Sequence, residues 1–138
     1  MFTGDQVVIE VVAALVVDLS EQRLLAYDPG GGLIYAALVS TGRAESPTPV
    51  GAFQVDRKYP ETTMVGRGYR VPLVKDVMCL AGGGLAPDQV CLHPAPWQEE
   101  ARERFGVPRS HGCIRTTTST ARWLFARTQV GTPVTVRP

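Results

Sequence analysis

Apolar residues in the first part of the chain occur in short runs and alternations that are typical of β-strands. Residues 7–17 form a nearly continuous apolar run rich in valine, which predicts a buried strand. Residues 23–28 and 33–39 are two more apolar segments, and the turn between them at 29–32 consists of one proline and three glycines. Apolar segments joined by such a turn predict a β-hairpin.

The middle of the chain contains a second predicted hairpin beside a segment without clear periodicity. Residues 52–55 follow a Pro/Gly-containing loop at 41–51 and predict a short strand. Residues 56–70 are polar and irregular and include two glycines, which predicts an excursion outside the core. Residues 71–80 and 89–93 flank a glycine-rich turn, so we expect them to form the second hairpin.

Helix signals appear only late in the chain. Residues 97–105 contain helix formers, and Gly106 predicts the end of that helix. Residues 117–128 place apolar side chains on one helical face, with Thr or Ser available as the N-cap. Residues 134–136 alternate as a final strand. We therefore expect a mostly-β single domain over residues 1–138, with one or two short helices and no internal repeat or linker.

Composition and charge exclude several classes of protein. With 138 residues the chain can bury a core without help from disulfides or metals. The net charge of +1, from 14 basic and 13 acidic residues, gives no electrostatic reason to expect nucleic-acid binding. The apolar run at 11–17 is too short to span a bilayer and lacks a positively charged leader and a cleavage site. We expect neither a transmembrane segment nor a signal peptide in this chain.

The strongest chemical signal is the sequence Ser-His-Gly-Cys-Ile-Arg at 110–115, which follows His93 after 16 intervening residues. A thiol such as that of Cys113 becomes a nucleophile when a neighbouring base or positive field favours the thiolate. Gly112 permits a sharp turn and a close approach of substrate. The chain has two histidines, His93 and His111, and spacing alone does not choose between them as the base.

The predicted elements place these residues near element ends. In a strand at 89–93, Cys91 and His93 share one face, and Pro94 ends the strand at the imidazole. Cys113 lies a few residues ahead of the helix expected from about Thr117. A helix N-terminus favours a thiolate, although its field falls off within about one turn.

These residues resemble the signature of the L,D-transpeptidases (YkuD-like catalytic domains). That signature is a histidine, a gap of this length, Ser or Thr, then His-Gly-Cys, an apolar residue, and Asn or Arg. Residues 17–24, 39–43, 48–53 and 131–134 also resemble the opening hairpin, a characteristic loop and the closing strand of this family. The resemblance covers residues 14–138 and implies a β-sandwich of mixed sheets with a short helix.

The resemblance gives the two histidines different roles. It implies that Cys113 attacks a carbonyl of a peptidoglycan stem peptide and expels its terminal D-amino acid, with His93 as the general base. It places His111 and the backbone of Gly112 and Cys113 at the substrate carbonyl, where N–H donors stabilise an oxyanion.

Three further residues complete the predicted site. Ser110 and Arg115 are implied to support the site and to contact substrate. In many relatives the base histidine is followed by Gly or Ser, whose carbonyl orients the imidazole, whereas this chain has Pro94. Proline keeps that carbonyl but has a fixed φ and no N–H, so we expect Pro94 to reshape the substrate entrance.

The resemblance also implies the course and setting of the reaction. An amine resolves the acyl-enzyme to give a cross-link, or water resolves it as in an L,D-carboxypeptidase, without a metal or an organic cofactor. Carbapenem β-lactams are the expected covalent inhibitors. A location in the cell envelope, periplasm or extracellular face and a monomeric state are expected. A non-catalytic cell-wall-binding module on the same fold is the rival interpretation.

Three further alternatives concern the cysteines. A zinc site built from His93, His111 and Cys113 would need a further ligand. Papain-like hydrolases place the histidine after the cysteine, and no histidine follows Cys113. Cys79 and Cys91 flank the glycine-rich turn, and we expect two small buried thiols rather than a cross-strand disulfide.

Overall fold

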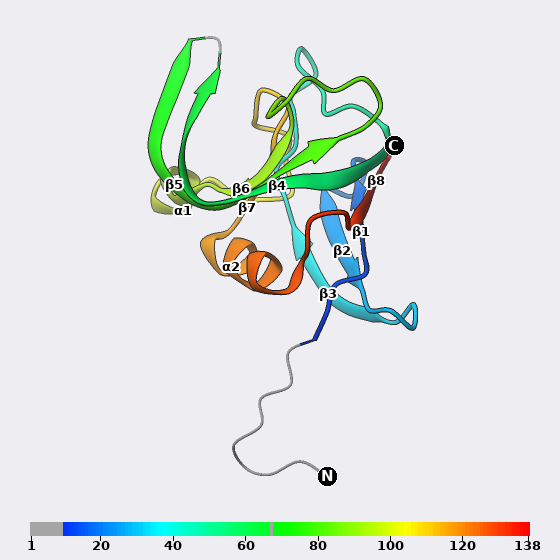
Figure 1. Ribbon diagram of the computed structural model, residues 1–138. Coiled ribbons are helices and arrows are strands. Elements are labelled where there is room, and N and C mark those ends of the chain that lie inside the picture. The colour runs from blue at the N-terminus through cyan, green and yellow to red at the C-terminus, as the bar shows by residue number, and fades with distance from the viewer. Residues whose placement is uncertain (1–9, 67) are drawn as a thin grey trace.

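The computed structural model describes residues 10–66 and 68–138, and these residues form eight strands and two short helices (Figure 1). The strands are β1 (Ala14–Asp18), β2 (Arg23–Tyr27), β3 (Leu33–Leu38), β4 (Gly51–Gly66), β5 (Tyr69–Ala81), β6 (Cys91–Pro94), β7 (Ile114–Thr116) and β8 (Pro133–Arg137). The helices are α1 (Pro96–Glu100) and α2 (Thr118–Arg127).

The described strands form one mixed sheet in the order β3-β2-β1-β8-β4-β5-β6-β7. The pairs β1/β8 and β6/β7 are parallel, and the other neighbours are antiparallel. Isolated bridges join Ser40 to Arg115 and Gly42 to Ser110, so the two ends of the strand order meet and the sheet folds over itself. The predicted mostly-β fold of mixed strand direction is confirmed, as are the hairpins β2/β3 and β5/β6.

The hydrophobic core contains side chains from strands β1, β2, β5, β6 and β7 and from helix α2. Its most buried large members are Leu15, Leu24, Met78, Leu80, Leu92, Ile114 and Leu124. Helix α2 contacts β5 and β6, and its Trp123 stacks on Tyr35 of β3 with ring centroids 4.2 Å apart. Thr117 caps the helix, since its side chain accepts a hydrogen bond from the Thr120 N–H. The predicted late helix and its cap are therefore confirmed.

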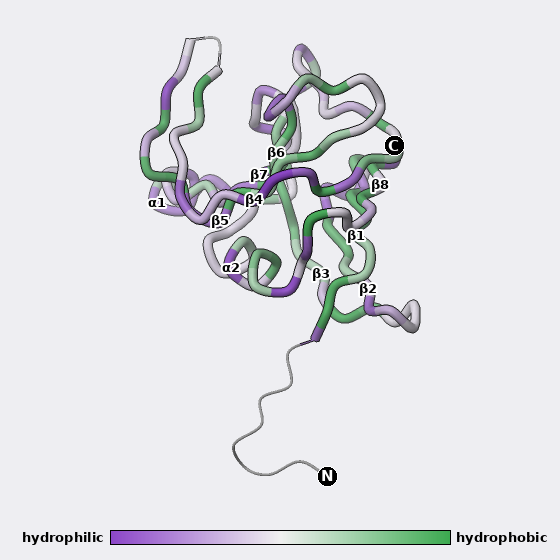
Figure 2. The backbone as a smooth tube through the Cα atoms, in the orientation of Figure 1, coloured by the Kyte–Doolittle hydropathy of each residue, from purple (hydrophilic) through white to green (hydrophobic). Residues whose placement is uncertain are grey.

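Strands β4 and β5 extend beyond the core as a long two-stranded arm (Figure 1). The expectation of an irregular excursion at 56–70 is wrong, because the β4/β5 ladder continues to the pair Gly66–Tyr69. Irregularities in the ladder, one of them between Thr62 and Met64, break the two-residue period that would have revealed the strand. Figure 2 shows hydrophilic and hydrophobic residues mixed along this arm.

The predicted helix at 97–105 is correct only in its first part. Helix α1 ends at Glu100, and Arg102 already has a positive φ of 56°. The chain then turns away, and the Gly106 N–H donates to the carbonyl of Val39 at 2.9 Å. A helix this short has little stability of its own, so these tertiary contacts determine where it stops.

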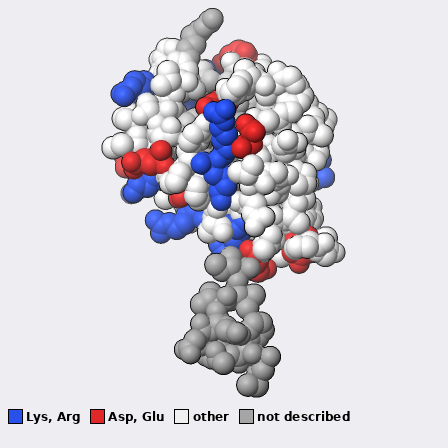
Figure 3. All heavy atoms as spheres, in the orientation of Figure 1, with Lys and Arg blue, Asp and Glu red and all other residues white. Residues whose placement is uncertain are grey.

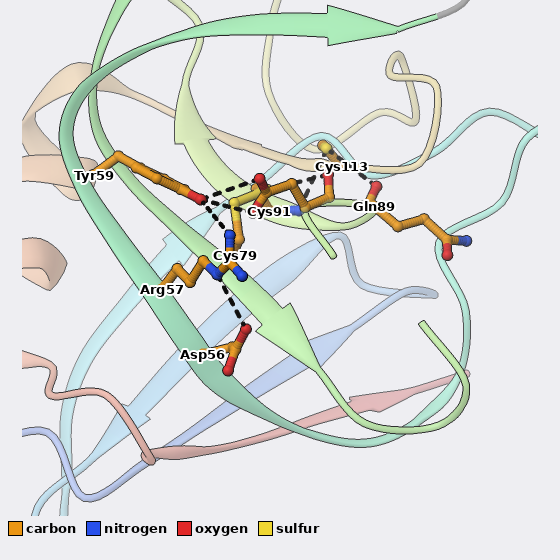
Figure 4. The surroundings of a disulfide bond; sticks show 8 residues. Asp56, Arg57, Tyr59, Cys79, Gln89, Cys91 and Cys113 are labelled. Atoms are coloured by element: carbon orange, nitrogen blue, oxygen red, sulfur yellow. Dashed lines mark hydrogen bonds and ion pairs between the residues drawn. A yellow bond between two sulfur atoms is a disulfide. The ribbon is translucent and has the colours of Figure 1, made fainter. Parts of the chain in front are cut away.

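The two cysteines near the glycine-rich turn form a disulfide, so the expectation of two reduced thiols is wrong. Cys79 and Cys91 are direct partners in the β5/β6 ladder, and this register brings their side chains together. Figure 4 shows the disulfide beside Cys113, which is the free cysteine of this chain.

Basic and acidic side chains lie beside one another on the face shown in Figure 3. No helix within residues 10–66 and 68–138 is long and apolar enough to cross a membrane. The strand predicted at 7–17 begins at Ala14, and residues 7–9 lie outside the described residues.

Candidate active site

The turn that carries Cys113 is held together by Ser110. The hydroxyl of Ser110 donates to the Cys113 carbonyl and accepts from the Gly112 N–H at 3.1 Å. Gly112 has a φ of +132°, which L side chains rarely adopt, so the turn explains the glycine of the motif. Ser110 is almost fully buried and therefore acts first as a local bond partner within this turn.

The parallel pairing of β6 and β7 joins the two separated parts of the sequence motif. Its register sets His93 beside Arg115. Two residues earlier on both sides, the Cys91 N–H donates to Cys113 Sγ at 3.4 Å (Figure 4). His93 and Cys113, which lie far apart in the sequence, thereby come to line one cavity.

His93 is buried, and one of its ring nitrogens is already bonded. Its Nδ1 lies 2.7 Å from the carbonyl oxygen of Pro94. Because a carbonyl can only accept, Nδ1 carries the proton and Nε2 is the acceptor of the neutral ring. Burial lowers the pKa of His93 to about 4; the bond to Pro94 opposes this shift, and the nearby charge of Arg115 adds to it. At neutral pH the ring is therefore an uncharged base.

Cys113 is also shielded, with 9% of its surface exposed. Burial raises the pKa of its thiol, whereas the Cys91 N–H and the charge of Arg115 lower it. Strand β7 separates Cys113 from α2, so the helix N-terminus lies beyond its effective range. The resting pair is thus a thiol and a neutral imidazole. Among the described residues no hydrogen bond joins them, so proton transfer requires a closer approach when substrate binds.

A cavity of about 210 Å³ opens over Cys113. Five predicted site residues line it: His93, Ser110, His111, Cys113 and Arg115. The remaining lining residues are Met64, Tyr69, Val71 and Trp97. The predicted residues Gly112 and Pro94 are not part of this lining and act through the turn and through the bond to the imidazole.

The four additional lining residues were missed by sequence reasoning. Met64, Tyr69 and Val71 belong to the arm, and Trp97 belongs to α1. Tyr69 stacks on the exposed ring of His111, with centroids 5.0 Å apart. One sequence signal could have revealed the arm. Apolar and aromatic residues stand on both sides of the glycines at 66 and 68, which is typical of two strands joined by a turn.

Arg115 places a positive charge in the cavity. One of its guanidinium nitrogens donates to Oε1 of the fully buried Gln98 at 3.4 Å. The guanidinium also lies 5.5 Å from the ring centroid of Trp97. Burial lowers the pKa of Arg115, but a guanidinium stays protonated at physiological pH. The cavity therefore holds a positioned cation that suits a carboxylate.

A second cavity of about 330 Å³ also reaches Cys113 and shares Tyr69 and His111 with the first cavity. Asp88 and Gln89 line its wall. The hydroxyl of Tyr59 donates to both carboxylate oxygens of Asp88, at 3.0 and 3.1 Å. Cys113, the candidate nucleophile, thus lines both a cavity with a cation and a cavity with a carboxylate.

The described residues contain no group of three or more His, Cys, Asp or Glu side chains close enough to hold a metal ion. They therefore offer no ligand set for the zinc alternative, in which His93, His111 and Cys113 would bind the metal. The arrangement is suited instead to attack by a thiol on a carbonyl beside a neutral base.

Comparison with known sequences identifies the family of this chain. The family model of the L,D-transpeptidase catalytic domain matches residues 13–136. L,D-transpeptidase 1 of Mycobacterium tuberculosis is 30% identical over 110 residues, which are 77% of this chain and 43% of that protein. The chain therefore spans less than half the length of this relative.

Solved structures of L,D-transpeptidases share this fold. An L,D-transpeptidase from Mycobacterium smegmatis superposes with a TM-score of 0.76 at 26% identity, covering 91% of this chain and 58% of that one. L,D-transpeptidase 3 of Mycobacterium tuberculosis, in complex with a faropenem-derived adduct, superposes with a TM-score of 0.75 at 25% identity, covering 94% and 61%. The chain belongs to the L,D-transpeptidase family of enzymes.

Proposed function

We propose that this chain is a cysteine acyltransferase that acts on peptidoglycan stem peptides. The observation that carries the proposal is the pair formed by Cys113 and His93, which share one cavity. His93 presents Nε2 as a proton acceptor because Nδ1 is bonded to Pro94. The family membership supports peptide cross-linking as the reaction.

In the first half of the reaction, the thiol of Cys113 gives its proton to Nε2 of His93 as Sγ attacks the peptide carbonyl carbon. The carbonyl oxygen becomes an oxyanion, which the backbone N–H of Cys113 stabilises, since the Gly112 N–H already donates to the Ser110 hydroxyl. The C–N bond to the terminal D-amino acid then breaks, and His93 returns the proton to the leaving amine. A thioester on Cys113 remains.

In the second half, an amine attacks the thioester carbonyl and His93 takes its proton. Collapse of the tetrahedral intermediate forms the new amide and returns the proton to Cys113 Sγ. Water in place of the amine gives hydrolysis, which is the carboxypeptidase alternative. The second opening next to Cys113 suits both outcomes, because it gives either acceptor a route to the thioester.

The charges in the two cavities at Cys113 assign the two substrates to different cavities. We assign the acyl donor to the cavity with Arg115, since a guanidinium binds the terminal carboxylate of a stem peptide. We assign the acceptor to the cavity with Asp88, where a carboxylate attracts an ammonium. The stack of Tyr69 on His111 lines both cavities.

The disulfide supports a location outside the cytoplasm. Disulfides persist in oxidising compartments such as the periplasm and the cell surface. Cys79 and Cys91 are both buried in the fold, and family members act on the cell wall. We therefore propose the cell envelope as the site of action.

A covalent inhibitor tests the proposal directly. The purified protein is incubated with a carbapenem, and the adduct is located by mass spectrometry. We expect one adduct on Cys113 in the parent, none in Cys113→Ala, and much slower formation in His93→Asn. Absence of an adduct in the parent, or an equal adduct in Cys113→Ala, would contradict the mechanism and favour the non-catalytic wall-binding module. The acyl product formed from a purified tetrapeptide then separates the two reactions, because transfer gives a cross-linked peptide and hydrolysis gives a tripeptide.

A further inference from the structure

Thr48 lies next to the catalytic turn although it is far from that turn in the sequence. It is almost fully buried, with 3% of its surface exposed. Its hydroxyl donates to the carbonyl of Gly112 at 2.8 Å and accepts from the N–H of Gly42 at 2.9 Å. One hydroxyl therefore connects the loop at 39–51 to the peptide group that precedes Cys113.

The bond to Gly112 also determines the direction of the Cys113 amide. The Gly112 carbonyl and the Cys113 N–H belong to one planar trans peptide unit, in which they point in opposite directions. Holding the oxygen on the Thr48 side therefore turns the N–H of Cys113 to the opposite side. A hydrogen bond at the oxygen also polarises the N–H of the same peptide group.

The neighbouring amide is not available for this task. The Gly112 N–H already donates to the hydroxyl of Ser110. The Cys113 N–H is attached to the residue whose sulfur attacks, so it lies close to any carbonyl that Sγ reaches. These two facts select the Cys113 N–H as the backbone donor for the oxyanion.

The loop that carries Thr48 is packed too tightly to move independently of the turn. A Cβ atom added to Gly42 would lie 2.1 Å from the Ser46 carbonyl oxygen and 3.0 Å from the Gly112 Cα. The Arg43 N–H donates to the carbonyl of Ser110 at 3.0 Å. The loop therefore contacts the turn backbone to backbone, with the Thr48 hydroxyl at the centre of the contact.

We propose that Thr48 is a positioning residue for oxyanion stabilisation, because it orients and polarises the Gly112–Cys113 peptide. This inference rests on the proposed acyl transfer at Cys113. It concerns the step in which a carbonyl oxygen takes up negative charge, and it leaves the thiol and its base unchanged.

Two reactions of the same thiol distinguish this role from a general structural one. Acylation by a carbapenem passes through an oxyanion at the β-lactam carbonyl. Alkylation by iodoacetamide is a displacement at a methylene carbon and forms no oxyanion at the attacked centre. Both reactions need the Cys113 thiolate, so their ratio reports on oxyanion stabilisation alone.

The variants are T48V, which replaces the hydroxyl by a methyl of similar size, and T48S, which keeps the hydroxyl. T48V is expected to slow carbapenem acylation by about 10-fold, which is less than the roughly 100- to 1000-fold cost of removing an oxyanion donor because the Cys113 N–H remains, and to change alkylation less than about 2-fold. T48S is expected to restore most of the acylation rate. T48A removes the same hydroxyl without adding a methyl and replaces T48V if that variant does not fold.

Two results would overturn the inference. Unchanged acylation in T48V or T48A would show that the hydroxyl is dispensable, and equal slowing of both reactions would assign Thr48 to thiol activation or folding. Failure of the proposed function itself has a different signature: the parent protein would alkylate at Cys113 but form no carbapenem adduct.

Discussion

The imidazole Nδ1 of His93 lies 2.7 Å from the carbonyl oxygen of Pro94, the next residue in the chain. This bond uses the polar backbone group that a proline retains, so proline at this position still orients the ring. Pro94 is held in place because it pairs with Thr116 in the β6/β7 ladder. The proline that distinguishes this chain at the sequence level therefore leaves the candidate base ready to accept a proton.

The pH dependence of acylation follows from this arrangement. Burial lowers the pKa of His93 to about 4, so the base stays unprotonated well below the ordinary histidine value of 6.5. We expect the second-order rate of carbapenem acylation to stay level as pH falls from neutral and to decline only as pH approaches about 4. Stopped-flow or mass-spectrometric rates across this range check the prediction. A decline centred near 6.5 would contradict it.

Stability should depend on pH through the same residue. Below pH 6.5 the unfolded chain binds a proton at His93 that the native state does not bind until about pH 4. The free energy of unfolding therefore falls as pH falls through this window, by up to roughly 3 kcal/mol at about 1.4 kcal/mol per pH unit. Urea unfolding at several pH values measures it. His93→Asn should remove this slope, and a slope that persists in the variant would assign it elsewhere.

The residues proposed to react could be predicted from the sequence, whereas several residues that line the cavity could not. The motif around Cys113 and its distance from His93 predict the proposed reacting pair, because a nucleophile and its base require fixed residue types. The arm with Tyr69 could not be found, since ladder irregularities hide its alternation and its outer face is polar. The disulfide between Cys79 and Cys91 depends on strand register, which is a property of long-range pairing that a single sequence does not specify.

Removal of the disulfide should destabilise the fold. Cys79 and Cys91 are separated by 12 residues, and a crosslink closing a loop of this size contributes about 3 kcal/mol in the chain-entropy account. We expect the double variant Cys79→Ala/Cys91→Ala to lose about this amount in urea unfolding. Thiol titration of the denatured, unreduced parent should detect one free thiol, that of Cys113. A count of three would rule the bond out.

Arg115 should control recognition of the acyl donor. Arg115→Met keeps an unbranched side chain but removes the cation, so a charge-assisted hydrogen bond to the donor carboxylate is lost. We expect kcat/KM for a stem tetrapeptide with a free terminal carboxylate to fall by about 10-fold, corresponding to about 1.4 kcal/mol. A tetrapeptide amidated at that carboxylate is the matched control. If the variant lowers kcat/KM for both peptides equally, Arg115 does not read the carboxylate.

Asp88 should affect the fate of the acyl-enzyme and leave its formation unchanged. Asp88→Asn keeps an acceptor for the Tyr59 hydroxyl but removes the charge that faces the second cavity. Lysinamide can attack through one amine while its second, protonated amine meets the carboxylate, whereas glycinamide has a single amine. Because Asp88 is exposed, its attraction for an ammonium is modest, on the order of a 2- to 5-fold change. We expect the variant to shift the product ratio toward hydrolysis by this factor with lysinamide and not with glycinamide.

High salt should reduce the parent's preference for lysinamide as well, since it screens exposed charges. If both acceptors respond alike, Asp88 does not select a cationic acceptor.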